Sequence, residues 1–362
     1  MERLFMPTKV YEGRGCVFDC PGEWSALGKR ALIVTGKTSG AKSGALYDVQ
    51  DVLDSLSICY VVYDNVLNNP TVENTYEAGM LAKEFKADFV IGIGGGSPLD
   101  LGKAAALYAT NDISPMEIYD EPENMPLPFV AIPTTAGTGS EVTQYSVLTV
   151  PEKETKVTVK GDYLFPRLAF LDSRYTKDLP ESVAKNTALD AMSHCIESIL
   201  SKRATHDSKA ISYCALEIIG KYLKDTNLFP MPDESRDALL HAAMLGGMAI
   251  AQTGTIVVHS MGYALTFFKD MPHGLANGKL LVPYLRRAKD EVSKECAKIF
   301  SALGCENFEG FKKLISSLNL PEYVITDDEA KMFASRTIKS YNVVLNPWII
   351  DEEQEREMLT LK

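Results

Sequence analysis

An aspartate and a histidine lie four positions apart in the stretch DAMSHCIES, which runs from Asp190 to Ser198. A helix brings residues at this spacing onto one face, so Asp190 and His194 could bind one metal ion from consecutive turns. The same spacing would also arise in an ordinary amphipathic helix that carries both side chains on its solvent-exposed face. The pair alone does not decide between a metal site and a surface helix.

Two of the five histidines lie where they could complete a metal site. His259 lies in the mostly apolar helical stretch GTIVVHSMGYALT, where a hydrogen-bonded core histidine is the more usual outcome. His273 lies in DMPHGLANG, which predicts a loop from which a side chain can be aimed freely. One carboxylate with three imidazoles would suit Fe²⁺ or Zn²⁺. Spacing in the sequence does not show whether the four side chains converge.

The stretch FVIGIGGGSPLDLGKAAA (residues 89–106) predicts a buried strand ending at Ile93, then three glycines, then a helix. We expect Ser97 to cap this helix and Pro98 to occupy its first position, where the missing N–H has no consequence. Glycines let the backbone approach a ligand, and a helix N-terminus offers free N–H groups and partial positive charge to a phosphate. A tight turn would need fewer glycines, so phosphate binding is the favoured interpretation.

A second polar loop, IPTTAGTGSEVT (residues 132–143), follows the next predicted strand. Its five hydroxyl side chains and two glycines are unusual for a plain connection. Together the two loops could hold the phosphates and the nicotinamide-ribose end of a dinucleotide. These glycines do not match the usual G-x-G-x-x-G fingerprint, because that motif should open the first strand–helix unit. The stretch GKTSG at 36–40 is not a P-loop, because Ala31 stands where that motif needs glycine.

The elements that must position these residues follow from hydrophobic patterning. Short β-branched runs at 30–36, 58–64, 88–96 and 128–135 alternate with helical patterns and predict a parallel sheet covered on both faces. From about Asp172 helical patterns take over, at 180–201, 205–224, 234–253, 255–268, 290–303 and 308–317, and an acidic tail predicts a surface helix. We therefore predict an α/β dinucleotide-binding domain with a parallel sheet (residues 1–174) and an all-α metal-binding domain (175–362).

Composition limits the class of protein. At 362 residues, with 46% hydrophobic and 23% charged residues, the chain is typical of a globular protein and too long for one core. A formal charge of -11 argues against nucleic acid and against anionic membrane surfaces as partners. No apolar run reaches the roughly 18 to 20 residues that span a bilayer, and the first residues do not resemble a signal peptide. Seven scattered cysteines indicate reduced thiols and hence a cytoplasmic protein.

Five stretches, GGGSPLD, PTTAGTGSEVT, DAMSHCIES, HSMGYALT and MPHG, occur in an order that resembles the iron-dependent (group III) alcohol dehydrogenases. The likeness covers essentially the whole chain and is strongest to the shorter members that include 1,3-propanediol dehydrogenases. It implies a dehydroquinate synthase-like architecture and a homodimer. It also implies that Asp190, His194, His259 and His273 are metal ligands in the catalytic centre, with Fe²⁺ expected and Zn²⁺ as the alternative.

The resemblance also places the cofactor. Gly95, Gly96, Ser97 and Asp100 match the family's pyrophosphate loop, Thr134, Thr135 and Thr138 match the loop around the phosphates and nicotinamide ribose, and Lys156 matches a lysine that reaches the ribose. Members that prefer NAD often carry an acid after the first strand, which repels a 2′-phosphate. This chain instead has Gly36, Lys37, Thr38 and Ser39 there. We therefore expect NADP(H) to be favoured over NAD(H).

The function implied is reversible hydride transfer between a primary alcohol or diol and NADP(H) or NAD(H), with the metal as Lewis acid. Many relatives carry a further histidine, thought to relay a proton, where this chain has Tyr263. One alternative is another enzyme on the same fold, either a zinc-dependent polyol (glycerol-type) dehydrogenase or a lyase such as 3-dehydroquinate synthase. An alternative from another class is a non-catalytic dinucleotide-binding or assembly protein.

Overall fold

The structure is a computed structural model that describes residues 3–224 and 229–360. The chain divides into two compact units, one formed by Met6–Leu179 and the other by Pro180–Lys362 together with Met1–Phe5. The sequence placed this division after residue 174 and assigned the N-terminus to the first domain. The N-terminal segment belongs to the helical unit because the backbone N–H and carbonyl of Phe5 both hydrogen-bond the side-chain amide of Gln252, each at 3.0 Å.

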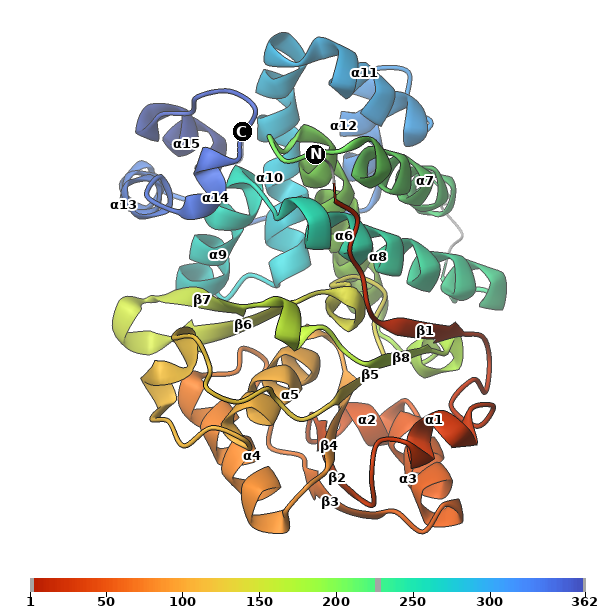
Figure 1. The fold of residues 1–362 in the computed structure, drawn as a ribbon. Coiled ribbons are helices and arrows are strands. Elements are labelled where there is room, and N and C mark those ends of the chain that lie inside the picture. Colours follow the sequence, from red (N-terminus) through yellow and green to blue (C-terminus); the bar gives the residue numbers. More distant parts are fainter. Residues whose placement is uncertain (1–2, 225–228, 361–362) are drawn as a thin grey trace. The chain divides into compact units, whose positions relative to one another are not determined.

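A six-stranded sheet, in the order β1-β8-β5-β4-β2-β3, forms the centre of the first unit (Figure 1). Its strands are β1 (Lys9–Glu12), β2 (Arg30–Thr35), β3 (Cys59–Tyr63), β4 (Phe89–Gly94), β5 (Phe129–Pro133) and β8 (Leu168–Leu171). All neighbouring strands are parallel. The chain passes from β2 to β3 on one side and returns to the other side of β2 with β4, so the strand order reverses between β2 and β4. Ligands of open parallel sheets bind beyond the carboxyl ends of the strands at such a reversal.

The sequence predicted β2 to β5 and missed β1, β8 and an antiparallel hairpin of β6 (Tyr145–Val150) and β7 (Thr155–Lys160). The helices of this unit are α1 (Pro21–Ser25), α2 (Ser39–Lys42), α3 (Ala45–Ser55), α4 (Val72–Phe85) and α5 (Gly96–Tyr108). Short 3-10 turns are η1 (Pro115–Tyr119), η2 (Ser140–Val142), η3 (Pro151–Lys153), η4 (Asp162–Leu164) and η5 (Ser173–Thr176).

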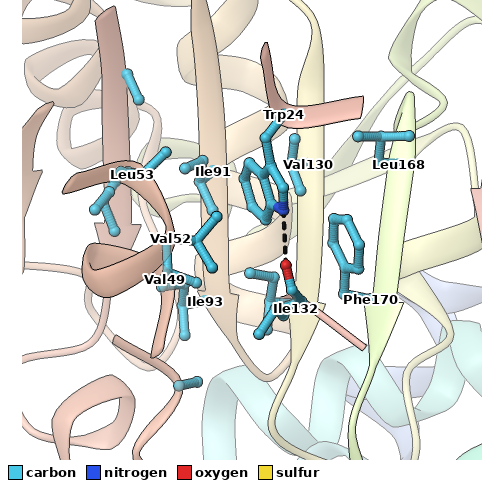
Figure 2. Close-up of a cluster of buried hydrophobic side chains, with 14 of the residues drawn as sticks. Trp24, Val49, Val52, Leu53, Ile91, Ile93, Val130, Ile132, Leu168 and Phe170 are labelled. Atoms are coloured by element: carbon cyan, nitrogen blue, oxygen red, sulfur yellow. Dashed lines mark hydrogen bonds between the residues drawn. The ribbon is translucent and has the colours of Figure 1, made fainter. Parts of the chain in front are cut away.

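Both faces of the parallel sheet are covered, which explains why its central strands are apolar throughout. On one face, residues of α1 and α3 pack over alternate strand residues such as Ile91 and Ile132 (Figure 2). The Trp24 indole stacks on Phe170 with ring centroids 5.0 Å apart and donates a hydrogen bond of 2.9 Å to the carbonyl of Val17. On the other face, α4 and α5 pack against each other and against β2 and β4. This core fixes the loops that leave the carboxyl ends of the strands.

The second unit is helical. Its longer helices are α6 (Glu181–Leu200), α7 (His206–Leu223), α8 (Asp233–Thr253), α9 (Val257–Lys269) and α10 (His273–Glu291). The remaining helices are α11 (Ser293–Ala302), α12 (Phe308–Ser317), α13 (Asp327–Thr337), α14 (Tyr341–Val344) and α15 (Glu352–Leu359), the last within the predicted acidic tail. In the described part of the chain no single helix is long and apolar enough to cross a membrane; α8 and α9, bent by 112°, pass that test only as a pair.

Helix α10 corrects the sequence analysis, which predicted a loop at His273 and no helix between residues 268 and 290. His273 is the first residue of α10. Gly274 and Gly278 resemble loop residues in the sequence, but here they allow close packing against α6. A Cβ atom at Gly274 would lie 1.9 Å from the carbonyl oxygen of Asn186, and one at Gly278 would lie 2.8 Å from Leu189 Cδ1. Helix α10 can therefore approach α6 closely at its first turns, which carry His273.

Candidate metal centre and cofactor loops

Helix α6 carries the stretch DAMSHCIES, and this part of the helix is buried. Every residue from Ala188 to Leu200 is buried, with Asp190 only 3% and His194 only 4% exposed. The interpretation of this stretch as a solvent-exposed helix face is therefore wrong. Two polar side chains kept inside a helical core need partners, because an uncompensated buried charge is strongly unfavourable.

Those partners are the two histidines from α9 and α10. Oδ1 of Asp190 lies 3.9 Å from Nε2 of His194, 3.8 Å from Nε2 of His259 and 3.8 Å from Nε2 of His273. The His194 and His259 rings stack with centroids 4.9 Å apart. Ligand atoms around a tetrahedral ion at about 2.1 Å are about 3.4 Å apart. Asp190, His259 and His273 each offer one ligand atom within 4.8 Å of the other two and form the compact part of the group, which His194 joins through its 3.9 Å approach to Asp190. The donor set of one carboxylate oxygen and three imidazole nitrogens fits a divalent iron or zinc ion.

The charges in the centre support one another. Burial acts to raise the pKa of Asp190, but the three imidazoles and Asn277 outweigh it and hold that pKa below its ordinary value. Burial acts to lower the pKa of His259, but Glu197 and Asp190 outweigh it and raise that pKa. A carboxylate that stays ionised beside clustered imidazoles is the arrangement that a divalent cation requires of its ligands.

Two residues that the sequence analysis did not single out also touch the centre. Glu197, fully buried, has Oε1 2.5 Å from Nδ1 of His259. Asn277 places Nδ2 3.0 Å from Oδ1 of Asp190 and 3.2 Å from Nε2 of both His259 and His273. Helical spacing was the available signal, since Glu197 follows Asp190 by seven residues and Asn277 follows His273 by four.

Tyr263 lies beside the same centre, one turn after His259 in α9. Its ring stacks on that of His273 with centroids 5.3 Å apart and an interplanar angle of 13°. It meets the His259 ring edge-on, with centroids 6.3 Å apart. Tyr263 is thus in ring contact with two of the candidate ligands.

In the first unit, the glycine loop follows β4 and leads into α5. Helix α5 begins at Gly96 with Gly95 as its cap, so the prediction of Ser97 as the cap is wrong. The Ser97 hydroxyl donates instead to the carbonyl of Asn68. Gly94 has a φ of +149°, which requires glycine. The first turn of α5 therefore begins on backbone alone and keeps its N–H groups of Gly96 and Ser97 for a ligand.

The two predicted cofactor loops meet at this turn. The N–H of Thr134 donates to the carbonyl of Gly94 at 2.9 Å. A Cβ atom at Gly95 would lie 3.2 Å from Oγ1 of Thr135, and one at Gly96 would lie 3.0 Å from Cγ2 of Thr138. Glycines therefore make room for the threonines, and backbone N–H groups and hydroxyls form one surface at the carboxyl ends of β4 and β5.

Asp100 supports this surface through contacts within the protein. Its carboxylate accepts from the Ser140 hydroxyl at 2.6 Å and from the Val147 N–H at 3.0 Å. The buried Lys103 ammonium donates to the same Ser140 hydroxyl at 2.8 Å. Lys156, on β7, lies near enough for its charge to act on Asp100. These contacts fix the second loop and the β6–β7 hairpin against α5.

The remaining predicted cofactor residues follow β2, at the reversal of strand order. Lys37, Thr38 and Ser39 are exposed. A Cβ atom at Gly36 would lie 2.7 Å from Oγ of Ser39, so that hydroxyl occupies the place of a side chain. The turn thus presents hydroxyls and an ammonium group where an acid could otherwise stand.

A parallel-sheet unit with glycine- and threonine-lined turns at its strand ends and a helical unit with a nitrogen- and oxygen-lined candidate metal centre are the arrangement expected of a metal-dependent dinucleotide enzyme. Family models agree with that expectation. Residues 7–173 match the iron-containing alcohol dehydrogenase model, and residues 184–360 match the model of the C-terminal part of the Fe-containing alcohol dehydrogenase family. The chain belongs to the iron-containing alcohol dehydrogenase family.

Individual relatives share this assignment. The chain is 33% identical to alcohol dehydrogenase 4 of Schizosaccharomyces pombe, covering 84% of this chain and 73% of that protein. It is 31% identical to lactaldehyde reductase of Escherichia coli K12, covering 83% and 80%. A crystal structure of an iron-containing alcohol dehydrogenase from Thermotoga maritima is 35% identical and matches with a TM-score of 0.93 over 99% of this chain and 98% of that one.

The family and the fold class expected from the five sequence stretches are therefore confirmed: a parallel-sheet N-terminal domain and a helical C-terminal domain of the dehydroquinate synthase-like architecture. The protein is an oxidoreductase that interconverts alcohols and aldehydes with iron and a nicotinamide cofactor.

Proposed function

We propose that Asp190, His194, His259 and His273 hold a ferrous ion, with zinc as the alternative, and that the enzyme reduces small aldehydes with a preference for NADPH. The observation that carries the proposal is the position of Asp190 Oδ1, which lies within 3.8 to 3.9 Å of Nε2 of all three histidines. Three separate helices, α6, α9 and α10, supply these side chains. Such convergence would be unusual for side chains with a purely structural role.

The protein's own residues prepare the reaction. A bound ferrous or zinc ion supplies Lewis acidity toward the oxygen of the alcohol or aldehyde. Asp190 provides the negative charge of the ligand set, since its carboxyl stays ionised. Backbone N–H groups at Gly96 and Ser97 orient dinucleotide phosphates, and the hydroxyls of Thr135 and Thr138 extend that surface. Rate is gained when this binding aligns the substrate carbon with the nicotinamide ring for direct hydride transfer.

The reacting group that we propose is a terminal aldehyde or primary alcohol. Relatives include the lactaldehyde reductase of Escherichia coli, the NADPH-dependent butanol dehydrogenase of Clostridium saccharobutylicum and the sulfoacetaldehyde reductase of Bilophila wadsworthia. Lactaldehyde and sulfoacetaldehyde share a terminal aldehyde and differ in the remainder. A homodimer and a cytoplasmic location stay predictions from the sequence.

The metal assignment is tested with anaerobically prepared apoprotein that is reconstituted with Fe²⁺ or Zn²⁺. Reduction of short aldehydes, followed through NADPH and NADH absorbance, is expected to return best with Fe²⁺. The variant His194→Ala should fail to regain activity or metal, whereas His206→Ala, which changes an exposed histidine at the start of α7, should regain both. Full activity in metal-free protein would overturn the assignment.

The cofactor preference is tested at Gly36. The variant Gly36→Asp places a carboxylate where a 2′-phosphate would lie, and like charges at close range are unfavourable by several kcal/mol. We expect the ratio of kcat/KM with NADPH to that with NADH to fall at least about tenfold. Gly36→Ala is the matched control, because it displaces the Ser39 hydroxyl in the same way without adding charge. An equal fall in both variants would refute the electrostatic argument, and a wild-type preference for NADH would refute the proposal itself.

A further inference from the structure

We propose that Glu197 is a positioning residue that fixes the tautomer and ring orientation of His259 for metal binding. The inference rests on the proposed ligand role of His259 and adds a carboxylate that does not itself reach the ion. Residues 190, 194 and 197 lie on one face of α6, so a single helix presents the carboxylate ligand, an imidazole ligand and this supporting carboxylate.

Both oxygens of the Glu197 carboxylate are engaged. Oε1 lies 2.5 Å from Nδ1 of His259, and Oε2 accepts the backbone N–H of Ile256, the residue that caps α9. Glu197 and His259 are almost completely buried, at 0% and 2% exposure. With two donors from one helix on two oxygens, the carboxylate cannot rotate without breaking one of the bonds. It therefore fixes both the start of α9 and the ring of a residue one turn further on.

The consequence for the imidazole follows from its two nitrogens. Oε2 of Glu197 already accepts from Ile256, and in the arrangement that we propose Oε1 accepts likewise, so that Nδ1 of His259 carries the proton that faces Glu197. The lone pair of the neutral ring then lies on Nε2, which faces Oδ1 of Asp190 at 3.8 Å. A carboxylate that accepts from the distal nitrogen of a ligating histidine orients the ring and makes it a stronger donor to the metal. The geometry at His259 has these features.

A purely structural role for Glu197 is the competing explanation, since the bond to Ile256 alone would stabilise the start of α9. The two roles differ in what they control. A structural role affects the free energy of unfolding of the metal-free protein. A positioning role also sets the His259 tautomer and the affinity for metal at a given stability.

The test uses Glu197→Gln in the full chain. The amide has the same shape, but an NH2 donor replaces one of the two oxygens that accept separately from His259 and Ile256. We expect affinity for Zn²⁺ and Co²⁺, measured by chelator competition, to fall about 10- to 100-fold. Glu355→Gln is the matched control, because Glu355 is equally buried and accepts from Thr337. It should change stability and leave metal affinity unchanged.

A second measurement reports the tautomer of His259 directly in the wild type. Nitrogen-15 NMR of histidine-labelled, metal-free protein, recorded at a pH where the imidazoles are neutral, reports which nitrogen of each ring carries the proton. Loss of one signal set in His259→Ala assigns that residue. We expect His259 to be the Nδ1–H tautomer in the wild type and a mixture of tautomers in Glu197→Gln.

The outcomes separate this inference from the proposal beneath it. An Nε2–H tautomer of His259 in the wild type, or wild-type metal affinity in Glu197→Gln, would overturn the role of Glu197. Unchanged metal affinity in His259→Ala, or no measurable affinity in the wild type, would instead overturn the proposed ligand set. A Glu197→Gln protein that does not fold leaves the wild-type tautomer to decide the matter.

Discussion

Replacing Gly274 by alanine tests how the helices hold the metal centre. Gly274 follows His273 in the first turn of α10, where a Cβ atom would lie 1.9 Å from the carbonyl oxygen of Asn186 and 3.0 Å from Cβ of Asp190. Ordinary contact begins at 3.4 Å, so the shortfall is about 1.5 Å. The obstructing atom is backbone, which means that α6 and α10 must separate.

The size of the effect follows from that separation. Forcing a methyl group into a packed interface destabilises a protein by about 1 to 3 kcal/mol. Asp190 and His273 lie on the two helices that must move, and their ligand atoms are already 3.8 Å apart. A further displacement of about 1 Å would take one donor out of bonding range, so we expect metal affinity to fall at least about tenfold.

The measurements are urea unfolding of the metal-free protein and chelator competition for Zn²⁺. Gly310→Ala in α12 is the matched control, because a Cβ there would have its nearest contact at 3.4 Å. Alanine at this position should stabilise the protein by about 0.5 to 1 kcal/mol through helix propensity, with unchanged metal affinity. If Gly274→Ala matched Gly310→Ala in both assays, the close approach of α6 and α10 would not be what positions His273.

Three further changes probe other parts of the molecule. Burial raises the pKa of Glu355 to about 7. Between about pH 5 and 7 the folded protein therefore retains a proton that the unfolded chain has released, and the free energy of unfolding should fall as pH rises through this range. Glu355→Gln should flatten that decline, worth up to about 3 kcal/mol, in urea titrations at a series of pH values; an unchanged slope would contradict the assignment. Lys103→Met removes the donor to Ser140, Thr143 and Tyr145 and should raise KM for the cofactor without changing metal affinity, whereas unaltered cofactor kinetics would contradict its support of the second loop. Trp24→Ala should destabilise the first unit by about 3 to 5 kcal/mol in chemical unfolding, and a loss below about 1 kcal/mol would mean that its stack on Phe170 contributes little.

Local sequence predicted β2 to β5, whose runs are rich in apolar and β-branched residues. β2 and β4 are buried along nearly their whole length, and their β-branched runs are unambiguous. β1 and β8 have only four residues each, and β1 is exposed at both ends. Their pairing joins segments more than 150 residues apart, between Lys9 and Leu168. Such a strand is defined by the partner that it finds, which a local pattern does not contain.

Helix α10 was missed for a different reason. Gly274, Gly278 and Pro283 lie inside it, and each is ordinarily a sign of a turn. The structure shows that the two glycines serve contact with α6. The sequence assigned the glycines at 94 to 96 to ligand approach; in the structure Gly95 and Gly96 lie against threonines of the second loop, and Gly94 lies against Pro98. Glycine therefore marks close approach in both places, but only the partner element distinguishes helix packing from a binding turn.

The difference between local pattern and long-range contact also explains which residues of the candidate metal centre could be predicted from the sequence. The pair Asp190 and His194 follows from helical spacing within one element, and Glu197 follows from the same spacing one turn later. His259 and His273 join the set only because α9 and α10 bring their side chains to Asp190 of α6, a long-range arrangement that no single stretch encodes. Resemblance to a family supplied that arrangement in advance. The geometry adds the physical cause: the glycines of α10 let it approach α6, and the two bonds of Glu197 anchor the start of α9, so the chain itself fixes the orientation in which these helices present their imidazoles.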